Sequence, residues 1–140
     1  MSIVERVSQR GYQAAAMSDR LLARARQLPP ADAALVELYL RGGASQREMA
    51  RLVGCPPGSI SRRVRRLLNR LNDPIVAALI EDGRGLDPQA RLLGIGRFLL
   101  GRSVRELAQA HRLSRAEVQQ ALSFLRGWQK GRRERTSNAE

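Results

Sequence analysis

One segment near the middle of the chain, from Ser45 to Leu67, reads SQREMARLVGCPPGSISRRVRRL. Ser45 is followed three residues later by Glu48, which is the spacing of a capping box at the start of a helix. Gly54 then supplies the positive φ that ends a helix sharply, and Pro57 suits the first position of the next helix. The segment therefore predicts a short helix, a tight turn and a second helix.

The second predicted helix has an apolar face and a cationic face. Its apolar residues recur at the spacing of one helix side and are Ile60, Val64, Leu67, Leu68 and Leu71. The opposite face carries Ser59, Arg62, Arg63, Arg66 and Arg70. A helix that enters the major groove of DNA needs such an apolar back and such outward hydrogen-bond donors. The pattern predicts a helix-turn-helix motif that contacts DNA; an arginine face that is merely solvated is the alternative.

The chain as a whole is strongly basic. Its 140 residues include 25 Lys and Arg against 13 Asp and Glu, which gives a net charge of +12, and 43% are hydrophobic, as in a globular protein. So large an excess of one sign is typical of proteins with a polyanionic partner, because it repels itself in a compact state. Guanidinium groups suit phosphates and guanine edges, so double-stranded DNA is the expected partner. Solubility, or an arginine-rich genome, is the alternative explanation.

The chain also contains an internal repeat with a shift of 58 residues. The shift aligns Pro30 with Pro88, Gly43 with Gly101, Ser45 with Ser103, Arg47 with Arg105, Glu48 with Glu106, Ala50 with Ala108, Ile60 with Val118, Val64 with Leu122 and Leu67 with Leu125. We therefore expect a second helix-turn-helix module, with convergent helix patterning as the alternative. Arg112 stands where the first module has Gly54. Since positive φ is sterically disfavoured for a non-glycine residue, we expect a looser or differently shaped turn there.

The second module has its own outward residues, which are Arg115, Gln119, Gln120, Ser123 and Arg126. Paired glutamines can bind adenine edges, but glutamine is also common on helix surfaces. The sequence therefore leaves two interpretations of this helix: it reads bases, or it is an ordinary surface helix.

Apolar residues at helical spacing run almost throughout the chain, and alternating β-branched runs are absent. The expected helices span residues 2–27 (with a break near Gly11), 31–41, 46–53, 57–71, 74–81, 88–100, 104–111 and 115–128. We predict an all-α fold of two tandem three-helix, helix-turn-helix modules with an N-terminal brace helix. The predicted organisation is an N-terminal helix at 1–28, a first module at 29–72, a short helix and linker at 73–86, a second module at 87–128 and a basic disordered tail at 129–140.

The N-terminal helix is predicted to begin at Ser2, which Glu5 follows at capping-box spacing. Its apolar side, which includes Ile3, Val7 and Leu21, either packs on the first module or forms the seam of a homodimer. We favour packing within the chain, because a three-helix module this small benefits from a brace.

Nothing in the sequence predicts a catalytic site, a metal or a cofactor. One cysteine and one histidine cannot supply the about four ligands of a zinc site, and no Walker A sequence is present. Gly94 and Gly96 resemble the start of a dinucleotide fingerprint, but no predicted strand precedes them, so we expect them to permit close helix packing. We therefore predict a binding protein and not an enzyme.

The sequence also predicts a location inside the cell. A single cysteine, Cys55, cannot form an internal disulfide, which fits a reducing cytosol. The first residues lack the apolar stretch of a signal peptide, and no run approaches the roughly 20 apolar residues that span a bilayer. We expect a cytoplasmic, nucleoid-associated protein without a membrane partner.

The first module resembles region 4, the C-terminal helix-turn-helix of bacterial sigma-70-type factors, and related response-regulator domains. The resemblance rests on the predicted helix 31–41 and on the runs Ser45-Gln46-Arg47-Glu48-Met49-Ala50, Val53-Gly54 and Ser59-Ile60-Ser61-Arg62-Arg63-Val64-Arg65-Arg66-Leu67. It implies a module that docks on promoter DNA and touches core RNA polymerase. With 4% aromatic residues the chain has no place for the aromatic-rich, promoter-melting region of a complete sigma factor, so a stand-alone sigma-like regulator is expected.

These observations predict a sequence-specific, double-stranded DNA-binding protein that regulates transcription. The residues expected to read bases or fix the register are Arg62, Arg63 and Arg66, and Ser59 is a further expected DNA-binding residue. Those expected to hold phosphates are Arg51, Arg65 and Arg70. A second contact is expected from Arg115, Gln119 and Gln120, and Ser123 is a further expected DNA-binding residue. The alternative is a protein–protein adaptor in which one module binds RNA polymerase or a phage or mobile-element complex.

Overall fold

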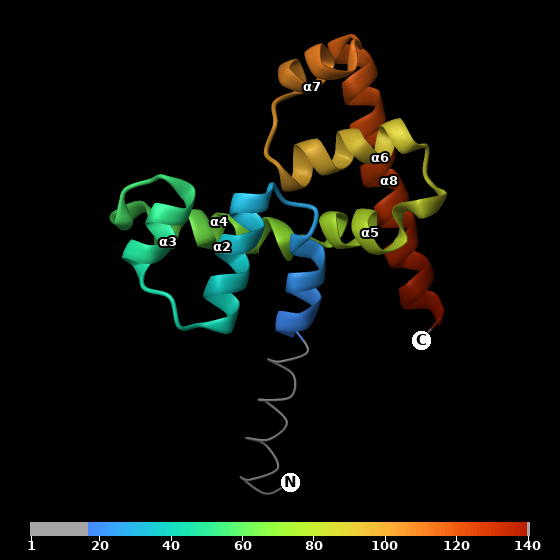
Figure 1. Ribbon diagram of the computed structural model, residues 1–140. Coiled ribbons are helices and arrows are strands. Elements are labelled where there is room, and N and C mark those ends of the chain that lie inside the picture. The colour runs from blue at the N-terminus through green and yellow to red at the C-terminus, as the bar shows by residue number, and fades with distance from the viewer. Residues whose placement is uncertain (1–16, 140) are drawn as a thin grey trace, which may run out of the picture. The chain divides into compact units, whose positions relative to one another are not determined.

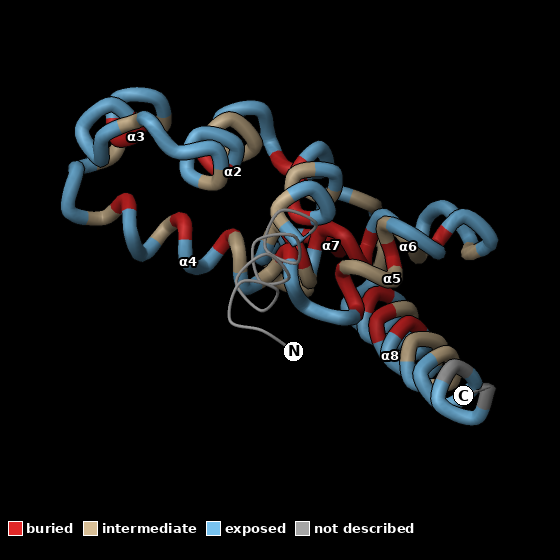
Figure 2. The backbone as a smooth tube through the Cα atoms, turned by 90° about the horizontal axis from the view of Figure 1, so that it is seen from below, coloured by how far each residue is buried: buried red, intermediate tan, exposed pale blue. Residues whose placement is uncertain are grey.

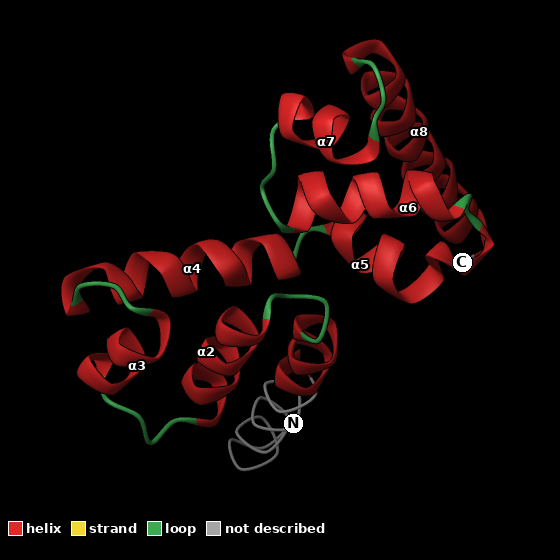
Figure 3. Cartoon of the chain, turned by 45° about the horizontal axis from the view of Figure 1, so that its top comes forward, coloured by secondary structure: helices red, strands yellow, loops and turns green. Residues whose placement is uncertain are grey.

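A computed structural model describes residues 17–139, and within this range the chain forms helices and turns without a strand (Figure 3). The predicted all-α fold is confirmed. The chain divides into two compact units after Leu71 (Figure 1). The predicted cap at Ser2 and break at Gly11 lie outside the described residues, and the described part of the N-terminal helix covers residues 17–25.

The first unit contains helix 17–25, α2 (Pro30–Arg41), α3 (Gln46–Val53), a 3-10 turn η1 (Pro57–Ser59) and α4 (Ile60–Leu71). Buried positions recur along α4 with exposed stretches between them (Figure 2), as an amphipathic helix requires. The core of the unit is formed by Leu21, Ala25, Leu28, Leu35, Val36, Met49, Ala50, Ile60, Val64, Leu67 and Leu71.

The second unit contains α5 (Pro74–Asp82), a 3-10 turn η2 (Gly83–Gly85), α6 (Pro88–Gly94), α7 (Val104–His111) and α8 (Arg115–Ala139). α6 runs on into a π-helical turn, η3 (Ile95–Leu99), which is closed by Leu100 N–H donating to the Ile95 carbonyl at 3.0 Å. The core of this unit is formed by Ile75, Val76, Leu79, Leu93, Ile95, Leu99, Leu107, Ala108, Val118, Leu122 and Leu125.

The helices begin at the capping residues that the sequence indicates. The Ser103 hydroxyl accepts from the Glu106 N–H at 3.0 Å while the Glu106 carboxylate accepts from the Ser103 N–H, a complete capping box. Ser114 and Glu117 form the same reciprocal pair at α8. At α3 the Ser45 hydroxyl accepts from Glu48 N–H at 3.1 Å. These local bonds explain why the predicted starts agree with the structure.

The two units repeat the same order of elements at the same 58-residue spacing. α3 and α7 have equivalent bounds, and the aligned pairs Ile60/Val118, Val64/Leu122 and Leu67/Leu125 are buried in their respective units. The repeat extends further than the sequence indicated, because α5 is equivalent to helix 17–25 and the buried Leu79 corresponds to the buried Leu21. The short helix predicted within residues 73–86 is present as α5 and is followed by η2. α5 packs against α6 and α8 as the first helix of the second unit, because it carries buried apolar residues.

The turn at Arg112 has the same form as the turn at Gly54, so the expectation of a looser turn was wrong. Arg112 has φ 55° and ψ 45°, and Gly54 has φ 68° and ψ 36°. The N–H of the following residue donates to an equivalent carbonyl in each turn, from Leu113 to Ala108 at 2.9 Å and from Cys55 to Ala50 at 3.1 Å. Packing of the two helices around each turn imposes this conformation on arginine despite its steric cost.

The segment that was predicted to be a disordered tail continues α8 as far as Ala139, so this expectation is also corrected. Its lysine, arginine and glutamate residues are good helix formers. One of them also fixes the segment to α5, because Arg132 Nη2 lies 2.6 Å from Asp82 Oδ2. The same guanidinium lies over the Trp128 ring, 5.1 Å from its centroid. Gly131 does not end the helix.

Two glycines of the second unit stand where helices approach closely. A Cβ atom on Gly94 would lie 2.6 Å from Leu125 Cδ1 and 2.9 Å from Leu79 Cδ1. A Cβ on Gly96 would lie 2.7 Å from Leu107 Cδ2. The prediction that these glycines permit close packing is confirmed.

Candidate nucleic-acid interface

The first unit holds α4 in position through α3 and the turn between them. Ala50 is 3% exposed where α3 packs against α4, so a larger side chain would separate the two helices. The start of α3 is also connected to α4 directly, because Gln46 Nε2 donates to the Ser61 hydroxyl at 2.9 Å. At the other end of α4, Arg24 Nη1 donates to the Leu71 carbonyl at 3.1 Å. Both ends of the helix are therefore bonded to other elements of the unit.

The predicted contact residues of the first unit gather on the outward side of α4. Arg62, Arg65 and Arg66 are exposed, and Arg51 is exposed on α3. One surface depression brings several of the predicted residues together and is lined by Asp32, Cys55, Ser59, Arg62, Arg63, Arg66, Leu67 and Arg70. A depression rich in guanidinium groups is chemically suited to phosphates and to the acceptors of base edges.

Arg63 differs from its neighbours because its charge is already paired. Its Nη2 lies 2.8 Å and its Nε 3.1 Å from Asp32 Oδ1, so α4 is joined to α2. The pairing leaves less of its charge for DNA and gives it a positioning role. Sequence reasoning missed this, because Asp32 is 31 residues away and sits in the first turn of α2, where an acid is expected to stabilise the helix end.

The predicted residue Ser59 is also bound locally. Its hydroxyl donates to the Pro56 carbonyl at 2.8 Å within the turn η1. This bond uses the hydroxyl proton and leaves the oxygen as an acceptor only. Ser59 therefore closes the turn that leads into α4, at the edge of the arginine-rich depression.

The second unit presents a different surface at the positions equivalent to the outward arginines. The 58-residue shift replaces Arg62 by Gln120 and Arg65 by Ser123, and it replaces Arg66 by Phe124, whose side chain is 59% exposed. The predicted residues Arg115, Gln119, Gln120 and Ser123 are all exposed on the first half of α8. The first half of α8 therefore carries no cation at the three positions equivalent to Arg62, Arg65 and Arg66.

Cations of the second unit appear farther along α8, from the predicted outward residue Arg126 into the segment predicted as a tail. Arg126, Lys130 and Arg133 line one depression together with Gln129, Glu134 and Ser137. Sequence reasoning missed Lys130 and Arg133 as members of a helix face. The available signal was the spacing of these basic residues, which are four and three positions apart, as on one side of a helix.

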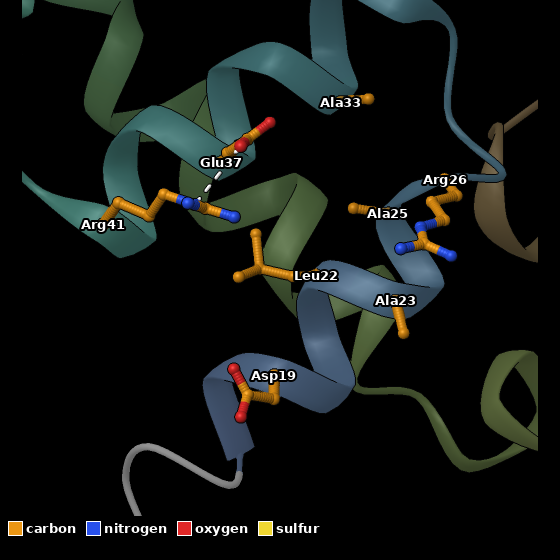
Figure 4. Close-up of a pocket in the computed structure, with 8 residues that line it drawn as sticks. All are labelled: Asp19, Leu22, Ala23, Ala25, Arg26, Ala33, Glu37 and Arg41. Atoms are coloured by element: carbon orange, nitrogen blue, oxygen red, sulfur yellow. Dashed lines mark ion pairs between the residues drawn. The ribbon is translucent and has the colours of Figure 1, made fainter.

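Another hollow of the first unit lies between helix 17–25 and α2 (Figure 4), lined by Asp19, Leu22, Ala23, Ala25, Arg26, Ala33, Glu37 and Arg41. Its charges are mixed, and Arg41 Nε lies 3.2 Å from Glu37 Oε1. This hollow lacks the excess of one sign found on α4. We therefore place the candidate interface on α4 and not here.

Within residues 17–139 no helix is long and apolar enough to cross a membrane. The same range contains no group of three or more His, Cys, Asp or Glu side chains that could hold a metal ion.

Comparison with known proteins adds one finding. Residues 18–71 match the family model described as Sigma-70, region 4. The match covers nearly all of helix 17–25 and extends through α2, α3 and α4 to the last residue of the first unit. It supports a DNA-binding, transcription-related helix-turn-helix in that unit, and it includes helix 17–25, which the sequence had indicated only as a brace. The match does not extend into the second unit. No curated protein and no solved structure matches the chain.

Proposed function

We propose that this protein binds a specific sequence of double-stranded DNA through α4 and regulates transcription as a stand-alone, sigma-like factor. The observation that carries the proposal is the set of three exposed arginines on the helix that follows the α3 turn, within the region that matches sigma-70 region 4. Region 4 is a DNA-binding module and not a catalytic one, so the proposed activity is binding. A contact with core RNA polymerase is part of the proposal.

Each arginine of the interface has a proposed role. Arg62 and Arg66 are one helical turn apart on the exposed side of α4, so both can reach base edges in one groove. Arg51, Arg65 and Arg70 would bind phosphates, which fixes the register without reading sequence. Arg63 would act through its pair with Asp32 by holding α4 on α2.

The experiment is selection of binding sites from a random double-stranded DNA library. We expect the wild type to enrich a motif and Arg62→Ala/Arg66→Ala to lose it. The matched control is Arg20→Ala/Arg26→Ala, which removes the same charge from two exposed positions of the same unit, one in helix 17–25 and one in the turn that follows it. If the α4 variant enriches the wild-type motif, or the control loses it equally, base reading by α4 is excluded.

For the second unit, one observation favours a different function. Gln120, Ser123 and Phe124 replace three arginines, which favours an adaptor whose α8 binds another protein. The sequence-based proposal instead has Gln119 and Gln120 reading bases. Selection with Gln119→Ala/Gln120→Ala separates the two, because a shortened motif supports base reading and an unchanged motif supports the adaptor.

A further inference from the structure

From Arg126 onward, α8 carries cations along one side of the helix. Arg126, Lys130 and Arg133, which we call the α8 stripe, lie on one side of the helix because they are four and three residues apart. Their common depression on the surface confirms that they are neighbours. Among the residues of α8 whose burial is described, Leu125 is the last buried apolar one, so the stripe begins where the buried side of the helix ends.

The charges of the stripe remain available for a ligand. Within the described part of the chain, no ion pair or hydrogen bond is found for the side chains of Lys130 and Arg133. Arg126 is held over the Phe98 ring, 5.1 Å from its centroid, which orders the guanidinium without neutralising it. Glu134 is the single acid in the depression, so the net charge there stays positive.

Arg132, a neighbouring cation on α8, has a structural role. Arg132 pairs with Asp82 and thereby fixes the extension to α5. The stripe makes no such bond to the rest of the unit. Clustering three cations on one face costs self-repulsion, and a polyanion bound there offsets that cost.

The comparison of the two units indicates which polyanion fits. In the first unit the cations stand at the centre of the outward face of α4, whereas the second unit has uncharged residues at those positions and its cations at the far end of α8. Cations spaced along one side of a helix suit the repeating charge of a phosphate backbone. The stripe is about 10 Å long, a length over which duplex DNA presents about six phosphate charges.

We propose that the α8 stripe binds the phosphate backbone of the DNA duplex that the first unit recognises. The inference rests on the proposed function, because it assumes that the chain binds duplex DNA. Lys130 and Arg133 form ion pairs with phosphate oxygens, and Arg126 adds a third from its place beside Phe98. These contacts strengthen binding to every sequence equally and leave the preferred motif unchanged.

The test uses the full chain, a duplex that contains the selected motif and a scrambled duplex, with affinity measured from 0.05 to about 0.3 M salt. Lys130→Gln/Arg133→Gln is expected to make the slope of log K against log salt less steep by about 1.8. At about 0.1 M salt this corresponds to roughly 10- to 60-fold weaker binding to both duplexes. Lys130→Arg/Arg133→Lys is expected to keep the wild-type slope, because it retains both charges.

The matched control is Arg84→Gln/Arg135→Gln. It removes two charges from exposed positions of the same unit, and Arg135 lies about 200° around α8 from Arg133. Equal slopes for the stripe variant and this control, with the wild type binding, would overturn the inference while the proposed function stands. A changed motif in the stripe variant would also overturn it, since phosphate contacts carry no sequence information. A wild type that binds neither duplex would instead overturn the proposed function.

Loss of helix is checked by circular dichroism on each variant. Should the double variant lose helix, the single variants Lys130→Gln and Arg133→Gln are each expected to reduce the slope by about 0.9. A reduction in neither would overturn the inference.

Discussion

Arg112 and Gly54 occupy equivalent left-handed positions, with φ values of 55° and 68°. Arginine has a Cβ atom and a long side chain, and glycine has neither. A residue with a Cβ atom pays about 1–2 kcal/mol in this region, while glycine loses more chain entropy on folding, about 0.5–1 kcal/mol. The two terms oppose each other, and the steric term is the larger. The second turn therefore carries a strain that the first does not.

Arg112→Gly is expected to raise the free energy of unfolding by about 0.5–1 kcal/mol, because it removes this strain. Gly54→Arg should lower it by a similar amount, because nothing lies within 4 Å of the added Cβ and the cost is confined to the backbone. Denaturant unfolding measures both changes. Destabilisation by Arg112→Gly would show that the arginine side chain makes a contribution greater than the strain.

Arg62 and Arg63 are adjacent on α4 but are expected to respond differently to substitution. Arg63→Ala removes the bonds to Asp32 and should destabilise the first unit by about 1 kcal/mol. Arg62→Ala should leave stability within about 0.5 kcal/mol of wild type and weaken DNA binding.

A double-mutant cycle with Asp32→Ala is the control for this pair. Arg63→Ala should couple to Asp32→Ala in unfolding measurements, and Arg62→Ala should not. Coupling of Arg62 to Asp32, or its absence for Arg63, would contradict the assignment of Arg63 as the residue that positions α4.

At the scale of elements, two glycines of the second unit should respond oppositely to the same substitution. Gly94→Ala brings a Cβ within 2.6 Å of Leu125 and should cost about 1–3 kcal/mol of stability. Gly127→Ala, where nothing lies within 4 Å, should stabilise α8 by up to about 1 kcal/mol. Thermal unfolding measures both, and tolerance of Gly94→Ala would mean that α6 and α8 can separate without loss.

The elements themselves were largely predictable, and the exceptions have a common cause. The bounds of α3 and α7 were predicted to the residue, since Ser45 and Ser103 cap their own helices and positive-φ residues end them. The continuation of α8 was missed because polar composition alone suggested disorder. The ion pair of Arg132 with Asp82 joins positions 50 residues apart, and spacing within one segment cannot reveal it.

For the whole molecule, DNA binding is expected to depend steeply on salt. If some six to eight phosphates are contacted, log K should fall with log salt with a slope of about −5 to −7. Fluorescence anisotropy with a labelled duplex that carries the selected motif measures the slope. An affinity that does not depend on salt would contradict DNA binding through arginine–phosphate contacts.

The difference in sequence and surface charge between the two units was only partly visible before the structure was known. The match to region 4 ends at the same residue as the first unit, so a boundary that the sequence suggested at 72 is close to that of the compact unit. The second unit repeats the helix order without the match and without the central arginines. The second unit is equivalent to the first in its helices because α5 contributes buried residues to its core.

Capping residues, turn residues and the periodicity of apolar side chains were enough to establish the helices, the repeat and the cationic face of α4. These features act within about one turn of helix, so a single segment contains all the information needed. Only the tertiary structure decided which cations are paired with acids and which can bind a ligand. Arg63 is paired with Asp32 and Arg132 with Asp82, whereas Lys130 and Arg133 stand together on one depression. The physical reason is that charge pairing depends on distances in space, which the folded chain sets.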